Sequence, residues 1–137
     1  MAHIHLSYEK PDDKTSFELI KAMDVFVGLN SVLNDTDTQR RKLYGKAGAF
    51  RIKKYGVEYR TPGNFWIFNQ EMVNIMFNQV HKAIDFVNSG KILSFEEGRL
   101  IQRAINSSNK ELAVELITKY DAVMPINESI ITEEVSA

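Results

Sequence analysis

Apolar side chains recur at three- and four-residue steps through residues 65 to 88, and this periodicity constrains the fold more than any other feature of the chain. The positions are Trp66, Met72, Val73, Met76, Phe77, Val80, Ile84 and Val87. Residues at this spacing share one face of an α-helix, so the segment predicts an amphipathic helix that buries its apolar face against other elements. Ser89 and Gly90 predict its end. We expect Trp66 and the two methionines to be core residues, and His81 to lie at the surface.

Three further helices are predicted near 16–28, 95–105 and 109–120. Thr15 or Ser16 can cap the first, and Gly28 indicates its end. Ser94 followed by Glu97 is typical of a capping box at the start of the second. Ser107 or Ser108 can cap the third. A short helix is also expected within 35–43.

Two segments have the pattern of strands. Residues 3–8 alternate polar and apolar side chains, and residues 55–61 end at a Pro-Gly turn. The sequence therefore predicts an α+β domain over residues 1–125, in which helices pack on a small antiparallel sheet. Residues 45–48 are expected to be a flexible connection. The polar and acidic residues 126–137 are expected to form a disordered tail.

Composition excludes several classes of function. The 137 residues carry a formal net charge of −1, so we expect no general attraction to nucleic acid or to an acidic membrane. The chain has no cysteine, which excludes disulfides and thiolate chemistry. No signal peptide and no apolar run long enough to span a membrane is evident. These features predict a cytoplasmic protein.

The candidate strands place chemically useful side chains together. His3 and His5 share one face of their strand, as do Glu58 and Arg60, because side chains alternate with period two. Imidazoles and a carboxylate suit a metal, and arginine suits a phosphate or carboxylate. The alternatives are solvent-facing histidines and a surface ion pair.

A longer pattern surrounds these residues. Basic side chains at Arg40, Arg41 and Arg51, small residues at Gly45, Ala47 and Gly48, and the stretch from Tyr55 to Trp66, including Asn64, follow the His-Ile-His pair in order. This combination resembles the carboxylate–amine ligases of the glutamine synthetase and glutamate–cysteine ligase superfamily, most closely the phage-encoded COOH–NH2 ligase-type proteins. The likeness runs from His3 to about Tyr120.

The resemblance implies ATP and Mg2+ as cofactors and a set of site residues. His5 and Glu58 match metal-binding positions of the family. His3, Arg40 and Arg51 match positions that face the nucleotide. The arginines at 40, 41, 51 and 60 match positions that meet transferring phosphate or substrate.

One departure bears on function. In the family the His-x-His strand lies in the middle of the protein, and strands before it carry further metal-binding carboxylates. Here only Met1 and Ala2 precede His3. The resemblance therefore implies a truncated, C-terminal half of a ligase, with exposed sheet edges that a partner or a second copy would cover.

Three hypotheses follow. The chain is a non-catalytic phage protein that binds a partner protein in the bacterial cytoplasm, for example an inhibitor of a host defence complex such as an anti-CRISPR. Alternatively, it is an ATP-dependent carboxylate–amine ligase whose site is completed by another chain or a second copy. The third hypothesis is a decayed fragment without selected activity.

Overall fold

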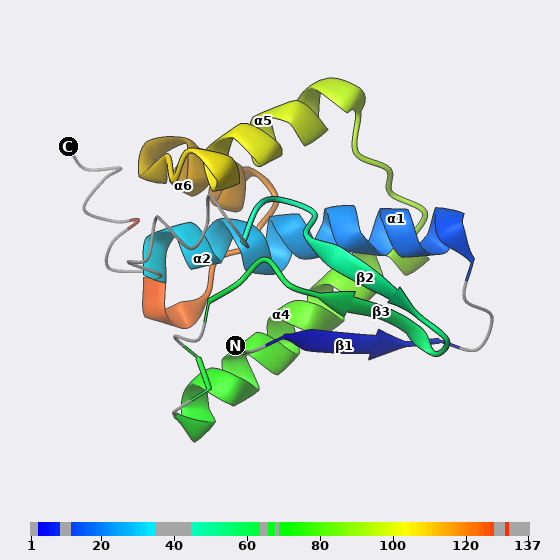
Figure 1. The fold of residues 1–137 in the computed structure, drawn as a ribbon. Coiled ribbons are helices and arrows are strands. Elements are labelled where there is room, and N and C mark those ends of the chain that lie inside the picture. The colour runs from blue at the N-terminus through cyan, green and yellow to red at the C-terminus, as the bar shows by residue number, and fades with distance from the viewer. Residues whose placement is uncertain are drawn as a thin grey trace.

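A long helical segment runs through the middle of the protein, and the other elements pack around it (Figure 1). The computed structural model describes residues 3–8, 12–34, 45–63, 66–67, 69–127 and 131. The central segment consists of α1 (Asp13–Met23), a π-helical turn η1 (Asp24–Gly28) and α2 (Leu29–Asn34). Helices α4 (Gln70–Asn88), α5 (Phe95–Asn106) and α6 (Lys110–Lys119) follow later in the chain. The 3-10 turn η2 (Pro125–Asn127) comes after α6, and the predicted α+β class is confirmed.

The prediction that the first helix ends near Gly28 is wrong, because the helix continues to Asn34. Gly28 serves a different purpose. A Cβ atom at this position would lie 2.7 Å from the Tyr59 hydroxyl and 3.0 Å from Ile105 Cδ1. The missing side chain therefore lets α5 and the strand that carries Tyr59 approach the helix. The cap also differs from the prediction, since Asp12 Oδ1 accepts from the Thr15 amide at 2.8 Å.

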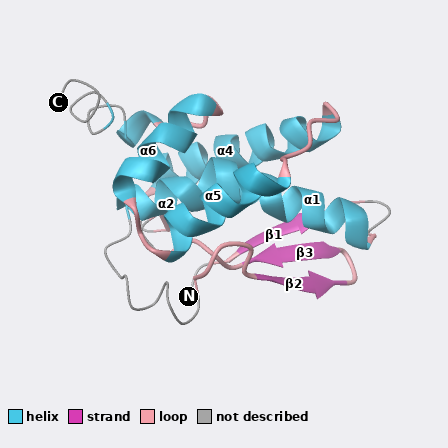
Figure 2. Cartoon of the chain, turned by 90° about the horizontal axis from the view of Figure 1, so that it is seen from above, coloured by secondary structure: helices cyan, strands magenta, loops and turns pink. Residues whose placement is uncertain are grey.

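A three-stranded antiparallel sheet lies on one side of the helices (Figure 2). Its strands β1 (Ile4–Ser7), β2 (Phe50–Lys53) and β3 (Gly56–Tyr59) are arranged in the order β1-β3-β2. The two predicted strands, near 3–8 and 55–61, are confirmed, whereas β2 was not predicted. The expected helix within 35–43 lies outside the described residues.

The long amphipathic helix is confirmed as α4, but it begins later than predicted. Asn69 caps it by accepting from the amide of Glu71 at 2.8 Å, so Trp66 precedes the helix and packs against the core from there. Met76 is buried as predicted, and His81 is exposed. None of the described helices is long and apolar enough to cross a membrane.

The helices near 95–105 and 109–120 are confirmed as α5 and α6. Ser94 caps α5 by accepting from the Glu97 amide at 3.1 Å. The Glu97 carboxylate accepts hydrogen bonds from Lys119, the last residue of α6, and from Tyr120, its C-cap, so this side chain connects the two helices. Asn109 caps α6, in place of the predicted Ser107 or Ser108.

Buried amides join the central helix to the C-terminal part of the chain. The carbonyl oxygens of Phe26 and Ala122 each accept from Gln79 Nε2, at 2.8 and 2.9 Å. The side-chain amide of Asn30 donates to the same two carbonyls. Asn127 donates to Asn30 Oδ1 at 2.6 Å and is fully buried. The packed part of the chain thus extends into the segment predicted as a tail.

The two helical glycines Gly28 and Gly98 should respond to alanine in opposite ways. Gly28→Ala is expected to destabilise the fold by about 1–3 kcal/mol, because the methyl group displaces Tyr59 and overpacks the core. A Cβ atom at Gly98 would have nothing within 4 Å. Gly98→Ala is therefore expected to stabilise α5 by about 0.5–1 kcal/mol. Urea unfolding followed by circular dichroism measures both, and a neutral Gly28→Ala would contradict the close approach.

Candidate functional site

One face of the sheet carries a group of charged and imidazole side chains, which we call the polar sheet face. In the strand register, His5 and Arg51 both lie directly opposite Glu58. Directly opposed residues of antiparallel strands project to the same side. Residues two positions away on each strand project to the same side. The polar sheet face therefore comprises six residues: His3, His5, Arg51, Lys53, Glu58 and Arg60.

The opposite face belongs to the core. Val57 and Tyr59 of β3 are fully buried, and Phe50 of β2 contacts Phe17 of α1 edge to face. The same alternation that buries these residues places Glu58 on the other side. The apolar pattern of the strands thus fixes which side chains form the polar sheet face.

Glu58 is the centre of the polar sheet face. Its residue surface is only 5% exposed. Oε1 lies 2.5 Å from His3 Nδ1, and Oε2 lies 3.4 Å from Lys53 Nζ. Desolvation raises the pKa of this carboxyl, but the charge and hydrogen bonds of His3 and Lys53 outweigh it, so the net pKa is lowered. Glu58 is therefore ionised at neutral pH.

One nitrogen of the His3 imidazole has a hydrogen-bond partner, and the other has none among the described residues. Desolvation lowers the pKa of His3, and the positive charge of Arg60 adds to this, against the opposing effect of Glu58. The ring is therefore mainly neutral near pH 7, where its Nδ1–H donates to Glu58 and Lys53 is the charged partner of the carboxylate. Nε2 is buried and has no hydrogen-bond partner among the described residues.

The remaining predicted site residues are placed as follows. His5 is exposed, and its Nδ1 bonds the hydroxyl of Tyr55 from the β2–β3 turn. Arg51 is exposed on the edge strand, and Arg60 is partly buried next to β3. Arg40, Arg41 and Asn64 lie outside the described residues.

Hydrogen bonds fix the backbone of the small-residue segment 45–48. The amide of Ala47 donates to Asn106 Oδ1 at 2.7 Å, and the amide of Gly48 donates to Asp24 Oδ1 at 3.0 Å. Gly48 has a φ of +67°, which favours glycine. The segment predicted to be flexible therefore connects α5 and the central helix to β2.

Asp24 is a buried acidic residue that the sequence analysis does not single out. It opens the π-helical turn, is 5% exposed, and accepts from the Tyr59 hydroxyl at 2.5 Å. Burial raises its pKa to about 7, against the opposing hydrogen bonds from Tyr59 and Gly48. The available signal was an acidic residue inside the apolar run Met23–Val27. Such π-turns occur often at functional sites.

The side chains of the polar sheet face suit the phosphate groups of ATP better than they suit Mg2+. Mg2+ takes oxygen ligands, and Glu58 is the only carboxylate on the polar sheet face, already paired with His3 and Lys53. No group of three or more His, Cys, Asp or Glu suited to a metal occurs within the described part of the chain. The described residues therefore do not make a Mg2+ site by themselves. The basic side chains Arg51, Lys53 and Arg60 do suit phosphate oxygens.

Comparison with known proteins gives one match. The family model for phage phiEco32-like COOH.NH2 ligase-type 2 proteins matches residues 2–131. No curated protein and no solved structure gives a significant match. The matched range includes every element of the sheet and all the residues of the polar sheet face. The chain belongs to the phage phiEco32-like COOH.NH2 ligase-type 2 family.

Proposed function

We propose that the polar sheet face binds the anionic part of a substrate, a phosphate or carboxylate, in a carboxylate–amine ligase-type site. The observation that carries this proposal is the set of three basic side chains, Arg51, Lys53 and Arg60, that the strand register places on one face with a single carboxylate. The ionised Glu58 accepts from His3 Nδ1 at 2.5 Å, which orients the imidazole beside these cations. ATP is the phosphate donor that family membership suggests.

In this proposal each residue has a role set by its position. Arg51 offers an exposed guanidinium fork to phosphate oxygens. Lys53 and Glu58 form an ion pair, and Glu58 orients the His3 ring. Arg60 adds positive charge beside His3. Because the described residues do not make a Mg2+ site, the carboxylates for the metal come from another polypeptide or a second copy.

Calorimetry of the purified chain with ATP tests the anion site. Replacing Arg51 with alanine is expected to weaken ATP binding about tenfold or more, since a charge-assisted bidentate contact is lost. Lys54→Ala is the matched control, because Lys54 is an exposed cation in the adjacent turn and outside the polar sheet face. ATP binding that is absent, or equally weakened by both variants, would contradict the proposal.

The composite nature of the site has its own test. The purified chain, at a concentration where it is monomeric, is expected to show no Mg2+-dependent ATP turnover. Turnover that appears with a second polypeptide should be abolished by Glu58→Ala. Amide synthesis by the purified chain alone, at the concentration where it is monomeric, would show that no other polypeptide is needed.

A second candidate function is non-catalytic inhibition of a host defence complex, such as an anti-CRISPR activity, in the bacterial cytoplasm. It is favoured by two apolar side chains near the start of α5, since Ile92 is 73% and Phe95 is 81% exposed. Exposed apolar side chains mark a protein-binding surface where they form a contiguous patch. In cells that carry a targeting CRISPR system, the chain should then restore phage plaques. The double change Ile92→Asp and Phe95→Asp should remove the effect, and an inactive parent chain would eliminate this candidate.

A further inference from the structure

A cavity of about 330 Å³ lies between the central helix and the beginning of α5. Lys21 and Asp24 line it from the central helix, and Leu93, Phe95, Arg99 and Ile101 line it from the other side. The cavity is separate from the polar sheet face. Tyr59, which bonds Asp24, and Glu58 are successive residues of β3 and project to opposite sides of the sheet.

Asp24 is a buried acidic residue in the lining of the cavity. Within the described residues, its hydrogen bonds from Tyr59 and from the Gly48 amide both end on Oδ1, at 2.5 and 3.0 Å. No described residue donates a hydrogen bond to Oδ2, so this is the oxygen left for a ligand. A carboxyl that is 5% exposed and lines a cavity is a strong acceptor for a cationic donor.

The lining of the cavity also carries positive charge. Lys21 and Arg99 are both exposed, and Asp24 is the only acidic residue among the side chains that line the cavity. The Arg99 guanidinium lies 5.9 Å from the centre of the Phe95 ring. Leu93 and Ile101 add apolar surface to the same lining. A ligand that matches these three kinds of group has a cationic end, an apolar side and an anionic end.

We propose that the cavity between the central helix and α5 binds a free amino acid with an apolar side chain. The ligand ammonium donates to Asp24, and its carboxylate meets Arg99 and Lys21. Its side chain packs on Leu93 and Ile101. This site is additional to the anion site on the polar sheet face and does not depend on it.

Charge linkage gives this assignment a pH-dependent signature. The groups that contact the Asp24 carboxyl are the Tyr59 hydroxyl from β3 and the Gly48 amide. The cations Lys21 and Arg99 line the same cavity, and Lys21 also pairs with Glu18 at 3.6 Å. Burial raises the pKa of Asp24 to about 7, so the carboxyl carries a proton in most molecules at pH 6. An ammonium ligand favours the ionised carboxylate, so its binding at pH 6 releases a proton.

Three probes of the same carbon skeleton separate the possible ligand chemistries. L-leucine carries both charges, 4-methylpentanoate lacks the ammonium, and 3-methylbutylamine lacks the carboxylate. Calorimetry is expected to show L-leucine binding at least about tenfold more tightly than either single-charge probe. At pH 6 the heat of L-leucine binding should also change with the ionisation enthalpy of the buffer. No L-leucine binding up to about 10 mM, or 4-methylpentanoate binding as tightly as L-leucine, would overturn the proposal.

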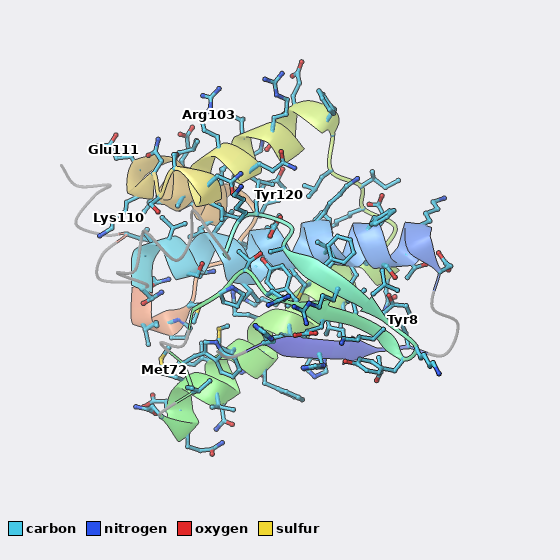
Figure 3. All side chains as sticks on the ribbon, in the orientation of Figure 1. Tyr8, Met72, Arg103, Lys110, Glu111 and Tyr120 are labelled. Carbon is cyan, nitrogen blue, oxygen red and sulfur yellow. The ribbon has the colours of Figure 1, made fainter. Side chains whose placement is uncertain are left out.

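Substitutions locate the site. Asp24→Asn keeps an oxygen for the Tyr59 and Gly48 hydrogen bonds but removes the charge, and it should weaken L-leucine binding at least about tenfold, as should Arg99→Ala. Arg103→Ala is the control, because this side chain points outward from α5 (Figure 3) and does not line the cavity. Arg51→Ala should leave L-leucine binding unchanged, which separates this site from the polar sheet face. Parent-like affinity in folded Asp24→Asn and Arg99→Ala would refute the assignment.

Discussion

Gly56→Ala is expected to cost about 3–5 kcal/mol of folding free energy and to leave much of the chain unfolded at moderate temperature. A Cβ atom at Gly56 would lie 2.1 Å from the backbone carbonyl oxygen of Leu6. Gly56 pairs with Ser7 at the hairpin end of β3 and has a φ of +151°, outside the range of other residues. The clash is with backbone, so no rotamer change relieves it. Relief requires β1 and β3 to separate.

Gly90→Ala separates the clash from the cost of a positive φ. Gly90 follows α4 with a φ of +77°, and a Cβ atom there would have nothing within 4 Å. This control should lose only about 1–2 kcal/mol, the cost of a left-handed conformation. Urea unfolding followed by the fluorescence of the single tryptophan, Trp66, measures both variants. Equal losses for Gly56→Ala and Gly90→Ala would show that strand contact does not limit the substitution.

The strand pattern predicted much of the polar sheet face. Period-two alternation places His3 with His5 and Glu58 with Arg60, and the observed register then brings His5 opposite Glu58. The β2 strand was missed because only four residues, Phe50–Lys53, carry its pattern after a glycine-containing segment. Without β2, Lys53 could not be recognised as the partner of Glu58. Pairing between strands is a tertiary property that a single strand does not encode.

The central helix shows where local sequence patterns do not predict the structure. Helix periodicity predicted α4 well, but Gly28 was interpreted as a helix end, since glycine is common there. Its actual role depends on the Tyr59 hydroxyl, which is far away in sequence. Asp24 was overlooked for the same reason, because its donors come from β3 and from Gly48. Contacts made across the core, rather than local propensity, decide both positions.

Asp24→Asn is expected to change how stability depends on pH more than any other single substitution. Burial raises the pKa of Asp24 from its ordinary value of 3.8 to about 7. The folded state therefore holds a proton that the unfolded state releases between these pH values, and stability falls as pH rises through this range. Each pKa unit corresponds to about 1.4 kcal/mol, so this group costs the folded state about 4 kcal/mol at pH 8. Asparagine stays neutral and keeps an acceptor for Tyr59, so the variant should avoid this loss.

Urea unfolding of the parent and Asp24→Asn at pH 5, 6, 7 and 8 measures the effect. The variant should be the more stable protein at pH 8, and its advantage should shrink steadily as the pH falls to 5. Comparing the two proteins cancels the carboxyls Glu58 and Glu97, whose pKa values are lowered and whose stabilisation is lost only in acid. Tyr59→Phe is a useful companion, because it removes one hydrogen bond that favours the ionised carboxylate and should steepen the loss of stability toward pH 8. A parent and an Asp24→Asn variant with parallel pH profiles would show that Asp24 is ionised throughout this range and that the buried carboxyl is stabilised by charge rather than strained by it.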